Sequence, residues 1–220
     1  MVTFKTTIDH IAVVASTLEA GVDYIQSVLG VDIPFGGVHT VMATHNHVMR
    51  LGDSLFLEVI ATNPEGEAAT QPRWFGLDDP AVRAKIAGQP QLLTWVARTT
   101  DLEAAMANAA SDYGVVQQLS RNDLRWRFAM PQDGRLLAAG MLPYLMQWSC
   151  ETHPAQHMED RDCYLTGLTI RHPYPQWLES QLQSIGALDA VTIEAAGSNT
   201  LPSLIARIDT PGGAVTLGSS

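Results

Sequence analysis

The amino-acid sequence predicts an α+β fold made of repeated modules, in which a strand, a helix and further strands follow one another. Three apolar strand candidates, at residues 7–14, 92–97 and 165–170, are each followed by a helix candidate and more strand candidates. The corresponding first-strand and last-strand positions are 48 residues apart in the first module, 53 in the second and 49 in the third. Few residues repeat, but the order and the spacing do, and such a period favours a modular architecture.

The first module, a βαβββ unit over residues 1–62, shows the pattern most clearly. Its helix is expected at 16–29, because Ser16 and Glu19 form a capping box and apolar residues follow at helical spacing. Gly30 is a natural helix stop. The strands expected after it lie at 38–51 and 55–60.

The second module, also βαβββ-like, covers residues 91–150, and a third, shorter βαββ(β) module covers 163–220. The sequence Leu-Glu-Ala opens both segment 18–22 and segment 102–106, which supports the repeat. Helices are expected at 101–113 and 175–186. Strands are expected at 125–130, 142–148, 191–195, 204–209 and 214–217. Polar stretches predict connecting loops at 63–90 and 151–162.

Composition narrows the classes of partner. The chain has 220 residues, of which 46% are hydrophobic, and a net charge of −10, which disfavours binding to nucleic acid or to an anionic membrane. It has no run of about 18 apolar residues and no leader pattern, so a cytoplasmic location is expected. Cys150 and Cys163 are expected to be free thiols.

His10 and Glu58 are the leading candidates for a functional site. Each is an ionisable residue inside an apolar strand candidate. A carboxylate buried in such a strand is costly unless it is paired or bound to a metal. Strand alternation places Asn46 and Arg50 on the same face, so Asn46 is a candidate substrate ligand. Arg50 could hold an acidic substrate, or it could simply pair with Glu58, which would account for the carboxylate without a metal.

The chain resembles the glyoxalase-like domain family of the vicinal-oxygen-chelate (glyoxalase/bleomycin resistance/dioxygenase) superfamily. The order of elements, the first-strand His10 and the last-strand Glu58 carry the resemblance. The matching segments are residues 8–11, 36–39, 44–46, 50–53, 57–60, 73–78, 94–98, 142–144 and 165–168. The resemblance implies βαβββ modules whose mostly antiparallel, curved sheets surround a cleft with helices outside. It does not fix one reaction.

The resemblance also implies metal ligands at the first and last strands of two paired modules. His10 and Glu58 fit the positions of the first module. In the second module Thr94 replaces the first-strand ligand, and Gln147 offers a weaker amide oxygen at the last-strand position. The sequence is therefore compatible with one divalent metal (Zn, Mn, Fe or Mg) or with none, and the incomplete ligand set favours none.

Two functions remain open. One is an isomerase or lyase acting on a small oxygenated metabolite, with Glu58 as the catalytic base and His10 holding a metal or a substrate oxygen. The other is a non-catalytic protein of the same fold that sequesters a small molecule. Further candidates for substrate binding are Trp74, Gln147 and His153, although a loop histidine is more often exposed. An odd third module leaves one pairing surface unused, which allows a homodimer.

Overall fold

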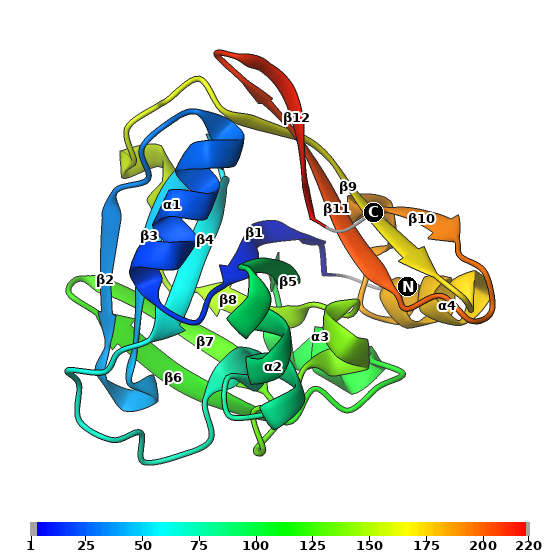
Figure 1. Cartoon of the computed structure of the whole chain (residues 1–220). Coiled ribbons are helices and arrows are strands. Elements are labelled where there is room, and N and C mark those ends of the chain that lie inside the picture. The colour runs from blue at the N-terminus through cyan, green and yellow to red at the C-terminus, as the bar shows by residue number, and fades with distance from the viewer. Residues whose placement is uncertain (1–3, 219–220) are drawn as a thin grey trace.

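The computed structural model of the chain describes residues 4–218 (Figure 1). The first elements are β1 (Thr6–Val14), α1 (Leu18–Leu29), β2 (Phe35–His39), β3 (Thr44–Gly52) and β4 (Leu55–Thr62). Next come α2 (Pro80–Gly88), β5 (Gln91–Thr99), α3 (Leu102–Asn108), β6 (Val115–Arg121), β7 (Leu124–Met130) and β8 (Tyr144–Trp148). The last are β9 (Tyr164–His172), α4 (Pro175–Ser184), β10 (Thr192–Ala195), β11 (Ser203–Thr210) and β12 (Gly213–Gly218).

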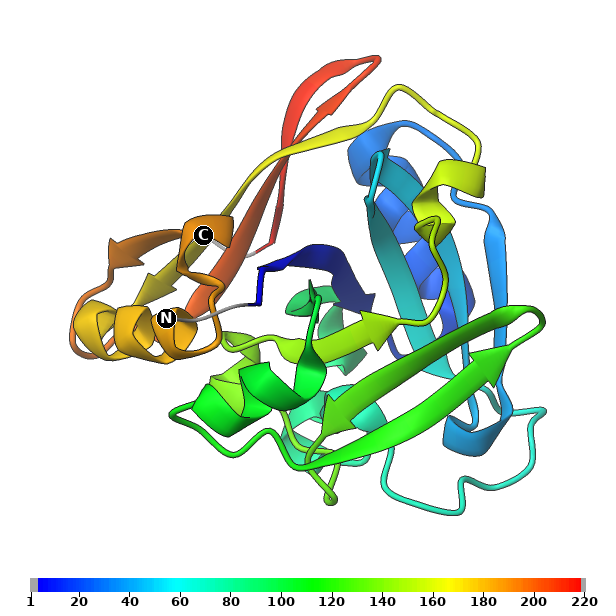
Figure 2. The ribbon, with the colours of Figure 1, turned by 180° about the vertical axis from the view of Figure 1, so that it is seen from behind.

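The first two modules form one eight-stranded sheet with the order β2-β3-β4-β1-β5-β8-β7-β6. Within each module the first strand pairs in parallel with the last, β1 with β4 and β5 with β8, and the other pairs are antiparallel. The antiparallel pairing of β1 with β5 joins the two halves. The sheet curls into a half-barrel, which brings the tip of the β6–β7 hairpin beside β2 (Figures 1 and 2). The predicted α+β fold with βαβββ modules and curved sheets is confirmed.

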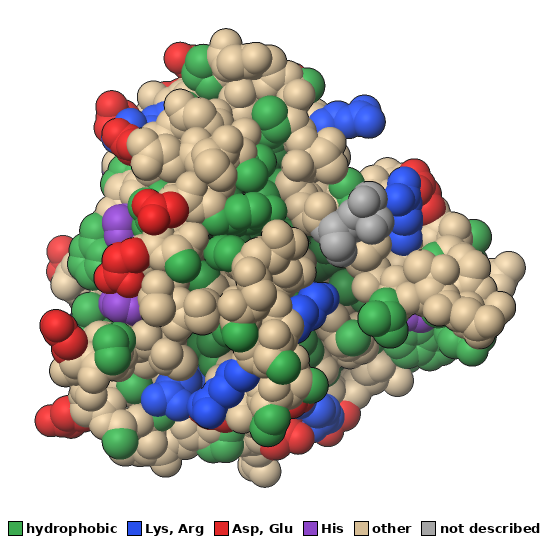
Figure 3. All heavy atoms as spheres, in the orientation of Figure 1, with side chains coloured by type: hydrophobic (Ala, Val, Ile, Leu, Met, Phe, Trp, Pro, Cys, Tyr) green, Lys and Arg blue, Asp and Glu red, His purple; other side chains and the backbone are tan. Residues whose placement is uncertain are grey.

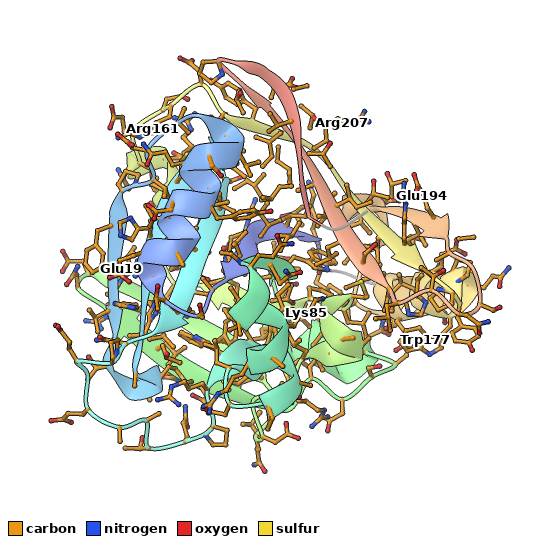
Figure 4. The ribbon with its side chains drawn as sticks, in the orientation of Figure 1. Glu19, Lys85, Arg161, Trp177, Glu194 and Arg207 are labelled. Carbon is orange, nitrogen blue, oxygen red and sulfur yellow. The ribbon has the colours of Figure 1, made fainter. Side chains whose placement is uncertain are left out.

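Each face of this sheet has its own apolar cluster, because side chains alternate along a strand. In β1, Ile11 and Val13 pack on the convex face with Ile25 of α1. Ala12 and Val14 pack on the concave face in a cluster that contains several aromatic rings. Helices α1, α3 and α4 lie outside, as expected, whereas Val82 and Ile86 of α2 pack in the concave-face cluster. Figure 4 labels one exposed side chain on each of three helices, Glu19 on α1, Lys85 on α2 and Trp177 on α4.

The third module has the predicted element order but a different strand pairing. Its sheet has the order β10-β9-β11-β12, so the strand after the helix, β10, pairs in parallel with β9. The last strand, β12, lies at the edge and does not pair with β9 as β4 pairs with β1. This sheet packs on the convex side of the half-barrel, and its buried residues share one cluster with those of α1, β1 and β5. Hydrophobic side chains fill the strip between α1 and the β11–β12 hairpin (Figure 3).

Several local predictions need correction. The N-cap of α1 is Thr17, not Ser16, and its hydroxyl accepts a hydrogen bond from the amide of Ala20. The predicted loop at 63–90 contains α2, which begins with a Pro at its first position and an Asp79 cap. Helix α3 ends at Asn108 rather than 113. Strand β6 was missed because its apolar residues do not alternate clearly. Among the described residues, no helix is long and apolar enough to cross a bilayer.

Candidate active site

A bulge in β1 brings two consecutive side chains to the concave face. Ile8 pairs with Ala97 and His10 pairs with Val96, so Asp9 is an extra residue in the ladder with β5. Regular alternation would turn Asp9 toward the convex side. Because of the bulge, Asp9 and His10 both reach the interior of the half-barrel, where they are joined by a 2.8 Å hydrogen bond between Nδ1 of His10 and Oδ1 of Asp9.

Glu58 lies on β4, the strand parallel to β1, and faces His10. Its Oε2 is 3.5 Å from Nε2 of His10, and its Oε1 accepts a 2.6 Å hydrogen bond from the amide of Asn46 on β3. All three side chains are buried. The predicted grouping of His10, Glu58 and Asn46 on one concave face is what the structure shows.

Asp9 is the most heavily bonded carboxylate of the site. Besides His10, its Oδ2 accepts a 2.7 Å hydrogen bond from the indole of Trp148 and lies 3.0 Å from Nε2 of His153. Nδ1 of His153 accepts a hydrogen bond from the amide of Ala155, so its proton is on Nε2 and points at Asp9. His153 is thus buried and holds Asp9, rather than lying exposed or lining the pocket.

These contacts set the charges of the site. Burial alone would raise the pKa of Asp9, but the hydrogen bonds from His10 and His153 hold that pKa well below its usual range. Burial alone would lower the pKa of His10, but the contacts with Asp9 and Glu58 raise it from the usual 6.5 to about 9. Burial likewise opposes the charge of Glu58, whose pKa is nevertheless lowered by His10 and Asn46. At neutral pH, Asp9 and Glu58 are therefore ionised carboxylates, and His10 between them is an imidazolium.

The pair His10 and Glu58 lines a pocket with about 560 Å³ of empty space, part of which is open solvent at its mouth. Six aromatic side chains line it, namely Phe56, Trp74, Phe75, Trp126, Phe128 and Trp148. The ring of Phe56 stacks on His10 with 4.5 Å between centroids. Trp74, predicted as a substrate contact, is therefore in the pocket wall. The geometry gives a buried acid–base pair at the wall of an apolar chamber.

Besides His153, two more of the predicted substrate-binding residues lie outside the pocket. Arg50 pairs with Asp53 at 2.5 Å and approaches Asp160 at 3.8 Å, so it neither lines the pocket nor neutralises Glu58. The side chain of Gln147 turns away from the cleft toward α3. Its oxygen accepts a hydrogen bond from the amide of Leu102 at 3.0 Å, and its nitrogen donates to the carbonyl of Thr100. Gln147 therefore caps a helix and is not available to a ligand.

A sequence profile of the glyoxalase-like domain family matches residues 8–186, which is most of the chain and includes every residue of this site. The chain belongs to the glyoxalase-like domain family. A search of curated protein sequences found no match.

Solved structures support the fold of this glyoxalase-like protein. A hypothetical protein from Staphylococcus aureus superposes with a TM-score of 0.56 and 14% identity, over 82% of this chain and 74% of that one. A mutant of 4-hydroxymandelate synthase from Streptomyces coelicolor gives a TM-score of 0.50 and 13% identity, over 97% and 62% of the two chains. A methylmalonyl-CoA epimerase bound to methylmalonyl-CoA matches more distantly, with a TM-score of 0.41 and 20% identity, over 68% and 99%.

The side chains of this glyoxalase-like site do not fit a divalent metal well. Nε2 of His10 and Oε2 of Glu58 face each other, but three protein ligands are the usual minimum for a catalytic ion. Gln147, the expected further donor, is bonded to backbone groups, and the hydroxyl of Thr94 is 3.5 Å from the carbonyl of Trp95. Within residues 4–218, no group of three His, Cys, Asp or Glu side chains is placed to hold a metal.

Sequence reasoning missed three residues of the site, Asp9, His39 and Arg121. Asp9 directly precedes His10, and only the bulge, which no sequence pattern marks, brings it into the cleft. Arg121 ends a strand that was not predicted, and its Nη1 reaches across the cleft to Oδ1 of Asn46 at 3.2 Å. His39 lies beside it. Burial lowers the pKa of His39 to about 4, so its ring is neutral.

Proposed function

We propose that this protein is an enzyme of the isomerase or lyase type that moves a proton on a small oxygenated metabolite, with Glu58 as the base. The observation that carries the proposal is the buried Glu58 carboxylate, held between His10 and Asn46 at the wall of an aromatic pocket. Ionised carboxylates at pocket walls with strongly shifted partners are typical of catalytic sites.

The chemistry follows from the two neighbouring groups. Glu58 is ionised at neutral pH and can accept a proton from a carbon next to a carbonyl group. The C–H bonding electrons then move toward the carbonyl oxygen. The protonated Nε2 of His10, directly beside Glu58, can donate a hydrogen bond to that oxygen and stabilise its developing charge. Return of the proton to the same or another atom completes the isomerisation.

Asp9 serves this reaction through His10. Its hydrogen bond to Nδ1 fixes the orientation of the imidazole and keeps it protonated. Trp148 and His153 in turn hold Asp9 in place. Asn46 fixes the carboxylate of Glu58, so that both reacting groups are oriented before a substrate enters.

A second candidate function is sequestration of a small molecule without chemistry. The observation that favours it is the aromatic lining, which would bind a flat apolar ligand whether or not Glu58 reacts. The catalytic function requires the negative charge of Glu58, whereas sequestration does not.

Wash-in of solvent deuterium tests the proposal without knowledge of the net reaction. The protein is incubated in D₂O with a panel of small 2-oxo acids, 2-hydroxy ketones and 3-oxo esters, and deuterium incorporation is followed by mass spectrometry. At least one compound should exchange faster than in buffer, and Glu58→Gln should slow that exchange by ~100-fold or more, the usual effect of removing a general base.

Glu65→Gln is the matched control, because Glu65 is exposed in the loop after β4. It should exchange at the wild-type rate. If none of the panel exchanges, and ligands bind equally well to the wild type and to Glu58→Gln, the catalytic proposal is rejected in favour of sequestration.

A further inference from the structure

Arg121 stands out among the residues that line the pocket. Of the described lining residues it is the one Lys or Arg, and every salt bridge between described residues leaves it out. Its two hydrogen-bonded contacts are to neutral groups, Oδ1 of Asn46 at 3.2 Å and Nε2 of His39 at 3.4 Å. The Arg121 side chain is half-buried and has no carboxylate partner within the described residues, so an anionic ligand that enters the pocket would meet an unpaired cation there.

The free part of the guanidinium is the part that binds carboxylates. Both contacts of Arg121 use Nη1, so Nη2 and Nε have no partner among the described residues. Arginine binds a carboxylate through two parallel N–H groups, and such pairs are stronger than neutral hydrogen bonds. The unused donors of Arg121 therefore match a carboxylate group of a ligand.

A second unpaired donor lies close by. The indole Nε1 of Trp74 is buried and has no hydrogen-bond partner within the described residues. The Trp74 ring contacts His39 edge-on, with 4.9 Å between centroids, and His39 also contacts Arg121. Buried N–H groups are almost always paired in folded proteins, so this end of the pocket lacks a hydrogen-bond acceptor.

The fold makes room for the Arg121 side chain at one pair of glycines. A Cβ on Gly36 would lie 2.5 Å from Oδ1 of Asn46, and a Cβ on Gly37 would lie 3.1 Å from Cδ of Arg121. Gly37 also has a φ of +149°, which favours glycine. The tip of the β6–β7 hairpin lies beside β2 (Figure 2), and the Arg121 side chain passes directly against the backbone of Gly37.

We propose that Arg121 is the specificity residue of this site and that the substrate is a small carboxylic acid with an apolar or aromatic body. Its carboxylate binds the free edge of the Arg121 guanidinium, and its body lies among the aromatic walls. Asn46 contacts Arg121 and Glu58 at once, so a bound carboxylate lies a few atoms from the base. The assignment rests on the proposed function for the reaction, but the binding step can be tested alone.

The binding test compares two ligands of equal shape. Phenylacetate and phenylacetamide differ only in a carboxylate and a neutral amide, and Trp74, Trp126 and Trp148 provide an intrinsic fluorescence signal in the pocket. Wild-type protein should bind phenylacetate at least ~10-fold more tightly, the range expected for one charge-assisted pair. Arg121→Gln should reduce the preference to less than ~3-fold, and Arg121→Lys should retain part of it.

Arg125→Gln is the control, because Arg125 is an exposed residue of the same hairpin that does not line this pocket. It should keep the wild-type preference. If Arg121 only ties the hairpin to β2, Arg121→Gln will lower the melting temperature and leave the preference for the acid unchanged, which overturns the proposal. Failure of wild-type protein to prefer phenylacetate overturns it as well.

The two proposals fail separately. If deuterium wash-in depends on Glu58 but occurs only with neutral compounds, the assignment of Arg121 is wrong and the catalytic role stands. If the acid preference depends on Arg121 and no acid exchanges deuterium, the carboxylate site stands and the catalytic role is wrong.

Discussion

At the scale of single residues, Asp9 determines the state of the site although it need not touch a ligand. It accepts hydrogen bonds from Trp148 and His10 and lies within hydrogen-bonding distance of His153, all inside the protein. A fully buried carboxylate is tolerated only with such partners. Because Asp9 keeps its charge, His10 keeps its proton, and Glu58 faces a cation rather than a neutral ring.

The pH dependence of stability should reveal this coupling. The pKa of His10 is about 9 in the folded protein and near 6.5 when unfolded, so its stabilising effect is complete below pH 6.5 and is lost as the pH rises to 9. We expect the free energy of unfolding in urea to fall over this interval. Asp9→Asn should lower the pKa of His10, measured by NMR titration. It should also reduce the pH-dependent decrease in the free energy of unfolding.

Asp209→Asn is the appropriate comparison, because Asp209 is an exposed carboxylate of β11. Its pH profile should match that of the wild type. A His10 that titrates near 6.5 in the wild type, or a pKa unaffected by Asp9→Asn, would contradict the assigned charges.

At the scale of elements, the sequence predicted features that depend on local patterns and failed to predict features that depend on how strands pair. A charged residue inside an apolar strand identified His10 and Glu58, since a buried charge is costly unless it is paired or functional. Alternation placed Asn46 correctly on the same face. Alternation alone would put Asp9 on the wrong face, because the bulge resets it. Arg121 was not assigned to the site, because it lies at the end of a strand without a clear period. Helix α2 was missed because its apolar stripe has only two buried residues, Val82 and Ile86.

The start of α2 offers a quantitative check on local structure. The side chain of Asp79 accepts a 2.8 Å hydrogen bond from the amide of Ala81, and Pro80 occupies the first helical position. Asp79→Ala should lower the free energy of unfolding by ~1 kcal/mol, the usual cost of losing such a cap. Lys85→Ala, an exposed change in the same helix, should alter it by less than ~0.5 kcal/mol. Equal effects of the two substitutions in urea titrations would contradict the cap.

At the scale of the whole molecule, the third module acts as a cover for the half-barrel rather than as an independent unit. Its buried residues belong to the same apolar cluster as α1 and β5, and Ser111 after α3 hydrogen-bonds Gln181 of α4 at 2.6 Å. The argument for a homodimer assumed an unused module surface, and this packing occupies part of it. The dimer stays a prediction without that support.

A shared core predicts that all three modules unfold together. Leu217 of β12 is fully buried, so Leu217→Ala should cost ~2–5 kcal/mol. The loss should appear in one transition, seen alike by circular dichroism and by the fluorescence of the tryptophans in the cleft. Leu201→Ala, in the same module but 84% exposed, should cost less than ~0.5 kcal/mol. Two separate transitions would show that the third module folds on its own.

The bulge at Asp9 has a consequence for how this site can change over generations. Ile8 and His10 pair with consecutive residues of β5, so losing the one codon between them would leave every strand partner in place. A single in-frame deletion could therefore remove the carboxylate that keeps His10 charged while the barrel stays whole. One genetic step would thus remove the contribution of Asp9 to the raised pKa of His10, while the contribution of Glu58 would stay.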